Sequence, residues 1–197
     1  MKVTMENSIK KDSIVPFLKW AGGKRWSTSY IPDIFPSSYN RYIEPFLGSG
    51  AVFFKLQPKS AILSDINKEL IDTYKAIKKD WRHVYNELKK HHYRHNKEYY
   101  YRIRKRKTMS IFTTAGRFIY LNRTCWNGLY RVNLKGEFNV PIGTKTNVIS
   151  STDDFERIAE QLKSAQLVTS DFEEIINLAG DNDFLFIDPP YTVKHKN

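Results

Sequence analysis

The sequence predicts an α/β protein with a mainly parallel sheet and an inserted, mostly helical lobe. Short apolar stretches that favour strands alternate with segments whose apolar residues recur at helical spacing, which is typical of parallel sheets with crossover helices. A long basic stretch of helical character, Lys75 to Lys107, interrupts this alternation. At 197 residues and 41% hydrophobic composition the chain can bury a core, and one domain with an insertion accounts for its length.

Two strands and a helix are expected near the amino-terminal end, after a polar tail at residues 1–13 that we expect to be disordered. Aromatic and β-branched residues at 41–46 predict a strand that leads directly into a glycine turn at 48–50. Residues 51–56 predict the opening of a helix, and residues 61–65 predict a second strand that ends in an acid. Together these segments predict a β-turn-α-β unit.

One long amphipathic helix is predicted from Asn67 to His91. Its apolar residues recur at steps of three and four and so form one face. They are Leu70, Tyr74, Ile77, Trp81, Val84 and Leu88. A second helix is predicted at 113–122. The stretch 126–146 predicts a hairpin or loop, since its Asn-Gly and Lys-Gly pairs favour tight turns.

The last third of the chain predicts a helix and two strands. Asp153 with Glu156 fits a capping box that would open the helix. Strands are predicted at 166–169 and 184–187. The second of them runs directly into Asp188.

Positive charge is concentrated in the expected insertion. The formal net charge is +11, and the segment from Lys75 to Lys107 holds 13 Lys or Arg against three acidic residues, which is ten of the eleven net charges. Such a block is typical of a surface that grips phosphates, although a solvated helical face has the same composition. We therefore predict a sheet domain, residues 14–74 and 164–197, and a lobe at residues 75–163 that contacts nucleic acid.

Several other protein classes are disfavoured. No apolar run approaches the roughly 20 residues needed to cross a bilayer, and the polar start lacks the apolar core of a signal peptide, so we expect a cytoplasmic protein with no membrane partner. Cys125 is the single cysteine, which excludes an internal disulfide and favours a buried apolar role. No thiol or carboxylate completes a metal site with His91, His92 and His95, and a solvated basic face explains them.

The glycine turn predicts a ligand-binding loop at the end of the first strand. Gly48 and Gly50 let the backbone turn tightly and let a ligand approach the main chain. Asp65 ends the next strand, where an acid can accept hydrogen bonds from ribose hydroxyls. Phe53 stands where a dinucleotide fingerprint has its third glycine, which disfavours a dinucleotide cofactor. Because short glycine turns are common, a purely structural turn stays open.

The sharpest signal is Asp188-Pro189-Pro190-Tyr191 at the carboxyl end of the last strand, the edge at which open α/β sheets bind ligands. A carboxylate and a rigidly held backbone carbonyl can accept both N–H bonds of an aromatic amine and draw its nitrogen towards tetrahedral geometry. The prolines fix the loop, and Tyr191 offers a face on which a flipped base can stack. We therefore predict that these four residues form the catalytic loop.

With these motifs in this order, the chain from about Pro16 to Tyr191 resembles the Dam-like, or D12-class, adenine-specific DNA methyltransferases. The resemblance implies a Rossmann-like, S-adenosyl-L-methionine-dependent sheet, a DNA-recognition lobe, and methylation of adenine N6, with GATC as the expected site. The matching elements are Lys19-Trp20-Ala21-Gly22-Gly23-Lys24, Glu44-Pro45-Phe46-Leu47-Gly48-Ser49-Gly50, Ser64-Asp65-Ile66-Asn67, Asn127-Gly128-Leu129-Tyr130-Arg131, Gly136-Glu137-Phe138-Asn139-Val140-Pro141, Ser170-Asp171-Phe172 and the Asp-Pro-Pro-Tyr loop.

The resemblance also implies roles for single residues. Those expected to bind S-adenosyl-L-methionine are Trp20, Lys24, Glu44, Gly48, Gly50, Asp65, Asp171, Phe172 and Asp188. Those expected to bind DNA are Trp126, Asn127, Leu129, Arg131 and Pro141. In such DNA recognition, an arginine is expected to form two hydrogen bonds with a guanine, and an apolar side chain is expected to contact a thymine methyl group. Two alternative roles stay open: Arg131 can bind a phosphate, and Trp126 can be an aromatic residue of the core. Relatives often carry an aromatic base contact where this chain has Thr144-Lys145, which leaves the reading of one base pair open.

Other functions also stay open. A similar loop can hold an RNA base or an amide nitrogen of a protein, and the chain can be an inactive DNA-binding remnant. Six residues follow Tyr191, so we expect a truncated sheet whose last strand has an unpaired edge, which favours self-association and weak activity. Double-stranded DNA is the expected partner. A cognate restriction endonuclease is a second candidate, and a replication mark is the alternative role.

Overall fold

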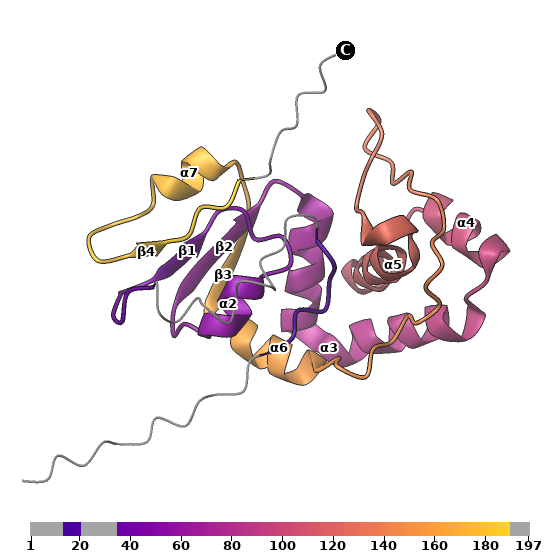
Figure 1. Ribbon diagram of the computed structural model, residues 1–197, viewed down its shortest axis with the longest axis horizontal. Coiled ribbons are helices and arrows are strands. Elements are labelled where there is room, and N and C mark those ends of the chain that lie inside the picture. The colour runs from indigo at the N-terminus through magenta and orange to yellow at the C-terminus, as the bar shows by residue number, and fades with distance from the viewer. Residues whose placement is uncertain (1–13, 21–34, 190–197) are drawn as a thin grey trace, which may run out of the picture.

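The computed structural model describes residues 14–20 and 35–189 (Figure 1). Four strands form one parallel sheet in the order β3-β2-β1-β4. They are β1 (Tyr42–Glu44), β2 (Ala61–Asp65), β3 (Ala165–Thr169) and β4 (Phe184–Leu185). The predicted strands are confirmed, β2 with the expected bounds, and so is the α/β fold.

Alternation along the strands divides the core into two layers. Successive residues of a strand point to opposite faces of the sheet. On one face Tyr42 and Leu63 join the main core, and on the other Ile43 and Ile62 pack with Ile175. Both faces are therefore apolar, as is usual for a parallel sheet.

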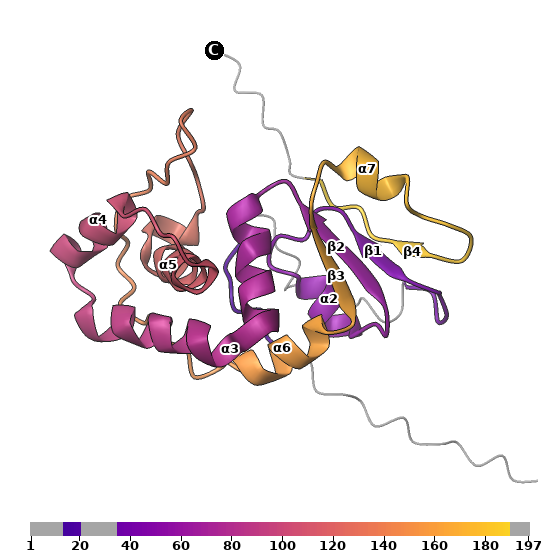
Figure 2. The same ribbon diagram turned by 180° about the vertical axis from the view of Figure 1, so that it is seen from behind.

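Helices cover both faces of the sheet (Figures 1 and 2). Three of them, α2 (Ala51–Leu56), the first part of α3 (Lys68–Arg94) and α6 (Phe155–Leu162), contribute to the main core. The short helix α7 (Phe172–Ile176) lies over the opposite face. None of the described helices is both long and apolar enough to span a membrane.

The predicted amphipathic helix is confirmed as α3, but the helix is interrupted. Its predicted apolar face is buried except for Trp81, which is half-buried. At Asp80 the backbone is extended (φ −160°, ψ 88°), and the Asp80 carboxylate accepts a hydrogen bond from the N–H of His83 (3.1 Å). Because aspartate favours helix starts over helix interiors, this residue divides the helix. The expected lobe boundary at residue 75 falls five residues before this break.

The lobe combines the second part of α3 with α4 (Lys97–Lys105), α5 (Ile111–Thr124) and the loop that follows α5. The helix predicted at 113–122 lies within α5. The loop opens with the 3-10 turn η2 (Trp126–Gly128) and carries isolated antiparallel bridges between Cys125 and Ile142 and between Val132 and Phe138. The hairpin prediction is thus confirmed. We call residues 126–142 the hairpin. It points to the same side of the molecule as the carboxyl ends of the strands, upwards in Figure 1.

The predicted capping box is wrong at its first residue. Asp154 is the N-cap of α6 and accepts a hydrogen bond from the N–H of Arg157 (3.0 Å). Asp153 instead forms a buried, two-pronged ion pair with Arg123, with both N–O distances at 2.6 Å. A buried guanidinium requires a charged partner. Asp153 therefore pairs with Arg123 in the core, and the neighbouring Asp154 caps the helix.

The histidines also differ from expectation. His91 is buried, its Nδ1 lies 2.8 Å from the Tyr99 hydroxyl, and its ring stacks on Tyr120 at 4.8 Å. Burial lowers the pKa of His91 to about 4. A solvated face therefore describes His92 and not His91. No group of three or more His, Cys, Asp or Glu that could hold a metal occurs in the described part of the chain. Cys125 is buried, as predicted.

An ion pair fixes the amino end of β4, an edge strand of the described sheet. The Arg41 side chain donates to the Asp183 carboxylate through Nε (3.1 Å) and a terminal nitrogen (2.5 Å). This contact lowers the pKa of Asp183 to about 2. Because β4 runs parallel to β1, Asp188 lies beyond the opposite, carboxyl end of the strand.

Candidate active site

The sheet has a topological switch point between β1 and β4. From β1 the chain continues to β2 on one side, and after β3 it returns across the sheet to β4 on the other. Ligands of open α/β sheets bind in the crevice at the carboxyl ends of strands beside such a reversal. The loop 44–50 follows β1 at this edge, and Asp188 follows β4. The fold therefore brings the two strongest sequence motifs together.

The glycine loop is shaped by close contacts. Gly48 and Gly50 have positive φ angles of 48° and 65°, which glycine adopts without strain. A Cβ added at Gly48 would lie 2.6 Å from Cδ1 of Trp20, so the indole ring lies directly against the loop. The Asp65 carboxylate accepts hydrogen bonds from the N–H groups of Gly48 (3.1 Å) and Asn67 (2.9 Å). Trp20, the two glycines and Asp65 thus form one unit.

Acidic side chains make this edge electronegative. Glu44 at the end of β1 is 3% exposed and accepts a hydrogen bond from the Tyr42 hydroxyl (2.9 Å). Burial raises the pKa of Glu44 to about 8, and the nearby carboxylates of Asp188 and Asp65 add to the shift. Burial also raises the pKa of Asp65, against the two N–H bonds that it accepts. A cation bound here would stabilise the ionised acids.

Apolar side chains surround the acids. Phe172 stacks on Phe46 with 5.3 Å between ring centroids, and Asp171 is the N-cap of α7. Ile66, next to the acid that ends β2, is 72% exposed. Phe46 and Ile66 were not assigned a role from the sequence. The available signal was their position immediately beside the carboxyl ends of β1 and β2.

Part of the predicted catalytic loop cannot be placed. Asp188 and Pro189 end the described chain, with Asp188 half-buried. Lys24, Pro190 and Tyr191 lie outside the described residues.

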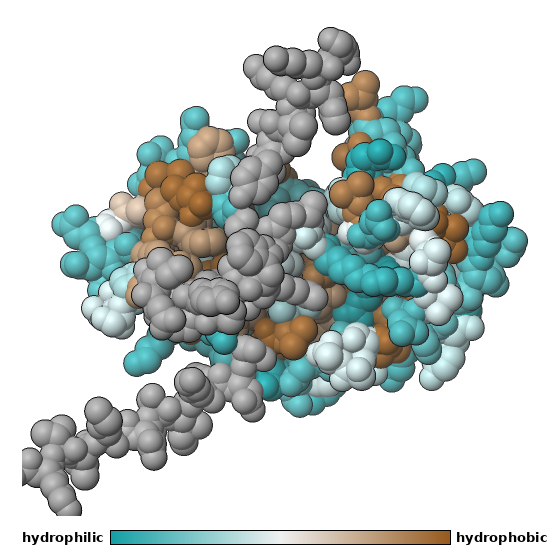
Figure 3. Space-filling model, in the orientation of Figure 1, coloured by the Kyte–Doolittle hydropathy of each residue, from teal (hydrophilic) through white to brown (hydrophobic). Residues whose placement is uncertain are grey.

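The five residues predicted to bind DNA all lie on the hairpin and are exposed: Trp126, Asn127, Leu129, Arg131 and Pro141. Trp126 is 53% exposed, which disfavours a core role. The Arg131 Nε donates to the Asn139 side chain (3.1 Å). Figure 3 shows apolar surface at the tip of the hairpin, where Leu134 is fully exposed, beside hydrophilic surface. The hairpin thus presents apolar, amide and cationic groups together.

A basic wall faces the hairpin across a cleft of about 690 Å³. Residues 104–107 at the end of α4, together with Arg117, line one side, and residues 133 and 136–139 of the hairpin line the other. The charge-rich segment noted in the sequence therefore lies beside the hairpin.

A further cation, Lys19, lies at the base of the hairpin and was not predicted from the sequence to have a role. The Lys19 main chain pairs with the Asn122 side chain (2.9 and 2.7 Å). Its side chain lies against Gly128, where an added Cβ would be 2.7 Å from Lys19 Cδ. Burial and the adjacent Lys145 lower the pKa of Lys19 to about 8. The only sequence signal was its position beside Trp20.

A parallel sheet with a glycine loop and acids at its switch point, flanked by a basic lobe, is typical of α/β enzymes that use a nucleoside-bearing cofactor on nucleic acid. The comparison with known proteins makes this specific. The chain belongs to the D12 class of N6 adenine-specific DNA methyltransferases, whose family model matches residues 20–197. It is an adenine-specific DNA methyltransferase by this membership.

Similar proteins come from bacteria and an archaeon. The chain is 38% identical over 200 residues to the type II methyltransferase M1.LlaDCHI of Lactococcus lactis, covering 97% of this chain and 69% of that protein. It is 37% identical to the type II methyltransferase M.MjaIII of Methanocaldococcus jannaschii (93% and 71%). It is 36% identical to a DNA adenine methylase of Haemophilus influenzae (89% and 63%).

The residues at the switch point fit the family's general cofactor, S-adenosylmethionine. That molecule combines a cationic sulfonium with ribose hydroxyls and an adenine ring. The buried Glu44, whose pKa is raised beside two other carboxylates, fits a cationic partner. The exposed Ile66 and the Phe46–Phe172 pair supply apolar surface for a ring.

Proposed function

We propose that this chain transfers a methyl group from S-adenosylmethionine to the N6 of adenine in duplex DNA, with GATC as its site. The observation that carries the proposal is the placement of Asp188-Pro189 at the carboxyl end of β4, across the switch point from Glu44 and the glycine loop of β1. This arrangement would put a base amine beside a methyl donor. The family match, together with the basic segment beside the hairpin, favours DNA adenine over the RNA-base and protein-amide alternatives.

The chemistry requires an amine nitrogen with an available lone pair. In adenine this lone pair is delocalised into the ring. The Asp188 carboxylate and the Pro189 carbonyl would accept the two N–H bonds and localise the pair, acting as fixed acceptors at the reacting centre. S-adenosylmethionine supplies an electrophilic methyl group on a cationic sulfur. Asp188 and Pro189 would hold the amine nitrogen towards this methyl group, S-adenosylhomocysteine would be the leaving group, and the displaced amine proton would pass to solvent.

The residues proposed to bind the cofactor lie at the sheet edge, and those proposed to bind DNA lie on the lobe. Trp20, Glu44, Gly48, Gly50 and Asp65 would hold the donor at the sheet edge, with Asp171 and Phe172 beside its adenine. The hairpin would read base edges, and the basic segment would bind phosphates without sequence preference. Lys19 would add a cation between them.

Transfer of labelled methyl groups tests the proposal directly. Duplexes containing GATC, the same duplexes with N6-methyladenine at that site, RNA of the same sequence, and a protein mixture would be compared. We expect label only on unmethylated GATC, at adenine N6. Label on RNA, on protein or on cytosine would contradict the proposed function.

Arg131→Ala should reduce discrimination between the cognate and a one-base-altered duplex by about 5- to 150-fold, since a bidentate base contact is worth roughly 1–3 kcal/mol. Binding to both duplexes would be measured at several salt concentrations. Lys107→Ala, on the basic segment, is the matched control and should weaken both duplexes equally and flatten the salt slope. Equal weakening by Arg131→Ala would make that arginine a phosphate clamp.

Cofactor binding should strengthen as pH rises towards 8. Glu44 has a raised pKa of about 8 in the free protein, so it is protonated at lower pH and must ionise to meet a cation. The pKa of Glu44 is higher in the folded protein than in the unfolded chain. Its contribution to folding stability is therefore fully present below the unfolded pKa and is lost as the pH rises through about 8. Calorimetry in two buffers should show proton release at pH 7. Glu44→Gln should abolish this release and flatten the pH dependence; an unchanged profile would exclude Glu44 from the effect.

Two partner predictions stay open to experiment. Three of the similar proteins are named type II methyltransferases, which favours a cognate restriction endonuclease as partner. Self-association through the edge of β4 remains a prediction, which sedimentation of the 197-residue chain would check.

A further inference from the structure

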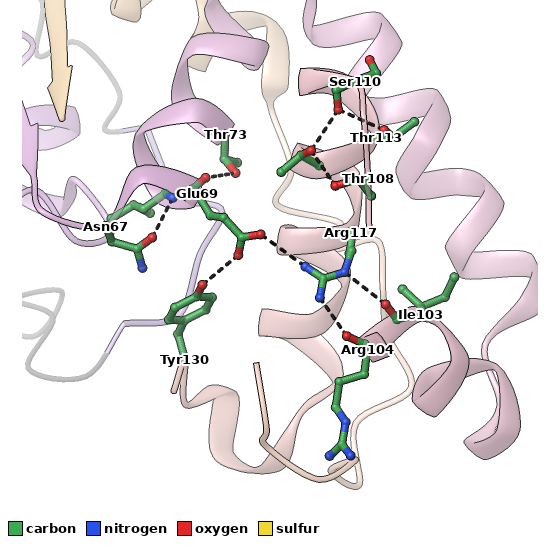
Figure 4. Close-up of polar contacts among 12 residues, drawn as sticks. Asn67, Glu69, Thr73, Ile103, Arg104, Thr108, Ser110, Thr113, Arg117 and Tyr130 are labelled. Carbon is green, nitrogen blue, oxygen red and sulfur yellow. Dashed lines mark hydrogen bonds and ion pairs between the residues drawn. The ribbon is translucent and has the colours of Figure 1, made fainter. Parts of the chain in front are cut away.

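We propose that Glu69 and Tyr130 form a coupling contact that holds the hairpin in register with the cofactor side of the site. The proposal rests on the proposed function for its biological meaning. Figure 4 shows the arrangement: Glu69 on α3 points between Tyr130 of the hairpin and Arg117 of α5. The Tyr130 hydroxyl donates to one carboxylate oxygen at 2.8 Å, and the Arg117 guanidinium lies 3.4 Å from the other.

Hydrogen bonds link the first turn of α3, which carries Glu69, to the glycine loop. Glu69 lies in the first turn of α3, two residues after Asn67, the N-cap of the helix. The Asn67 N–H donates to Asp65 at 2.9 Å, and the second oxygen of Asp65 accepts from Gly48. A shift of the glycine loop on ligand binding would therefore move the first turn of α3 through two consecutive hydrogen bonds.

Tyr130 is fixed in the hairpin by packing of its aromatic ring. Its ring packs against the rings of Trp20, Phe118 and Phe138, with 5.8, 4.8 and 5.5 Å between ring centroids. The residues before and after Tyr130 are exposed. Burial raises the pKa of Tyr130, and so does the Glu69 carboxylate, so the phenol remains a donor. The inward ring thus sets the position of the outward residues, two of which are proposed to read bases.

Arg117 extends the contact to the basic segment. It is 8% exposed, and its guanidinium donates to the carbonyls of Ile103 (3.1 Å) and Arg104 (2.8 Å) at the end of α4. One carboxylate thereby joins the start of α3, the hairpin and the end of α4. Because Glu69 also lines the cleft beside the hairpin, its loss would loosen both walls of the proposed DNA surface.

Hydrogen exchange gives a readout that is independent of methylation. S-adenosylhomocysteine would be added to the full chain, and exchange of the amides in the hairpin would be followed. In the unsubstituted protein we expect this ligand to slow exchange there by about fivefold or more, the lower range of typical coupling between sites. Tyr130→Phe and Glu69→Ala should remove the slowing and leave binding of S-adenosylhomocysteine nearly unchanged.

Two variants separate coupling from general support. Tyr100→Phe also removes the phenol hydrogen bonding to the hairpin, which goes to the carbonyls of Val140 (3.0 Å) and Pro141 (3.4 Å). It should speed exchange in the hairpin but keep the response to the ligand. Glu69→Gln retains an oxygen that can accept from Tyr130 and should keep most of the response that Glu69→Ala loses.

The outcomes distinguish this proposal from the proposed function. A hairpin that ignores bound S-adenosylhomocysteine in the unsubstituted protein, or a Tyr130→Phe variant that responds like Tyr100→Phe, would overturn the coupling even if GATC is methylated. A coupled hairpin in a chain that methylates no DNA would support the coupling and contradict the proposed function. Failure to bind S-adenosylhomocysteine would overturn both.

Discussion

Replacing Asp188 by alanine should lower methyl transfer by on the order of 100- to 1,000-fold, the usual loss when one fixed polar partner is removed from a reacting centre. Asp188 is the third residue after the end of β4, at the switch point, and its carboxylate lies close enough to Glu44 to raise the pKa of Glu44. The Asp188 carboxylate is thus placed to accept a hydrogen bond from the target amine. Single-turnover rates with saturating DNA and cofactor would measure the chemical step separately from binding.

Asp183→Ala provides the matched control. Asp183 and Asp188 flank the same short strand, but Asp183 pairs with Arg41 at the opposite end of β4. Its loss should weaken the anchoring of β4 and lower thermal stability, with a smaller effect on the single-turnover rate of the folded protein. Cofactor affinity must be measured for both variants, because Asp188 also lies on the cofactor side. An Asp188→Ala rate within about tenfold of the unsubstituted rate would remove Asp188 from the mechanism.

Asp153→Ala should lower the free energy of unfolding by about 3–5 kcal/mol, because it leaves the buried Arg123 charge without its anionic partner. Arg123 is held at the junction of the sheet and the lobe. Its guanidinium donates to the carbonyls of Phe17 (2.9 Å) and Val148 (2.8 Å) as well as to Asp153. Urea unfolding followed by circular dichroism would give the change.

The neighbouring acid supplies the control for this prediction. Asp154→Ala removes the N-cap of α6, for which the expected cost is about 1 kcal/mol. A result in which Asp153→Ala costs no more than Asp154→Ala would contradict the prediction that the buried ion pair with Arg123 is the larger contribution. A double change of Arg123 and Asp153 to apolar residues should recover much of the loss, since no unpaired charge would remain.

Local features of the sequence were sufficient for the elements of the fold. Residues 61–65 form a strand with the predicted bounds, and the apolar face of α3 follows the three-and-four spacing. Strand propensity, helical periodicity and the position of Asp188 after a strand depend on near neighbours, so they can be read without the rest of the chain. The same holds for the hairpin, which its glycine pairs indicated.

The tertiary structure alone decided which of two adjacent acids caps α6 and that His91 is buried. Each depends on a partner or a packing surface that periodicity does not encode: Asp153 meets Arg123 30 residues away. The candidate site shows the same division. Its motifs could be recognised in the sequence. The contact of Trp20 with Gly48 arises only when the sheet domain folds, and the contact of Glu69 with Tyr130, 61 residues apart, arises only when the lobe folds against the sheet. Sequence determines local conformation because backbone preferences are short-ranged, whereas packing selects which distant polar groups can satisfy one another when buried.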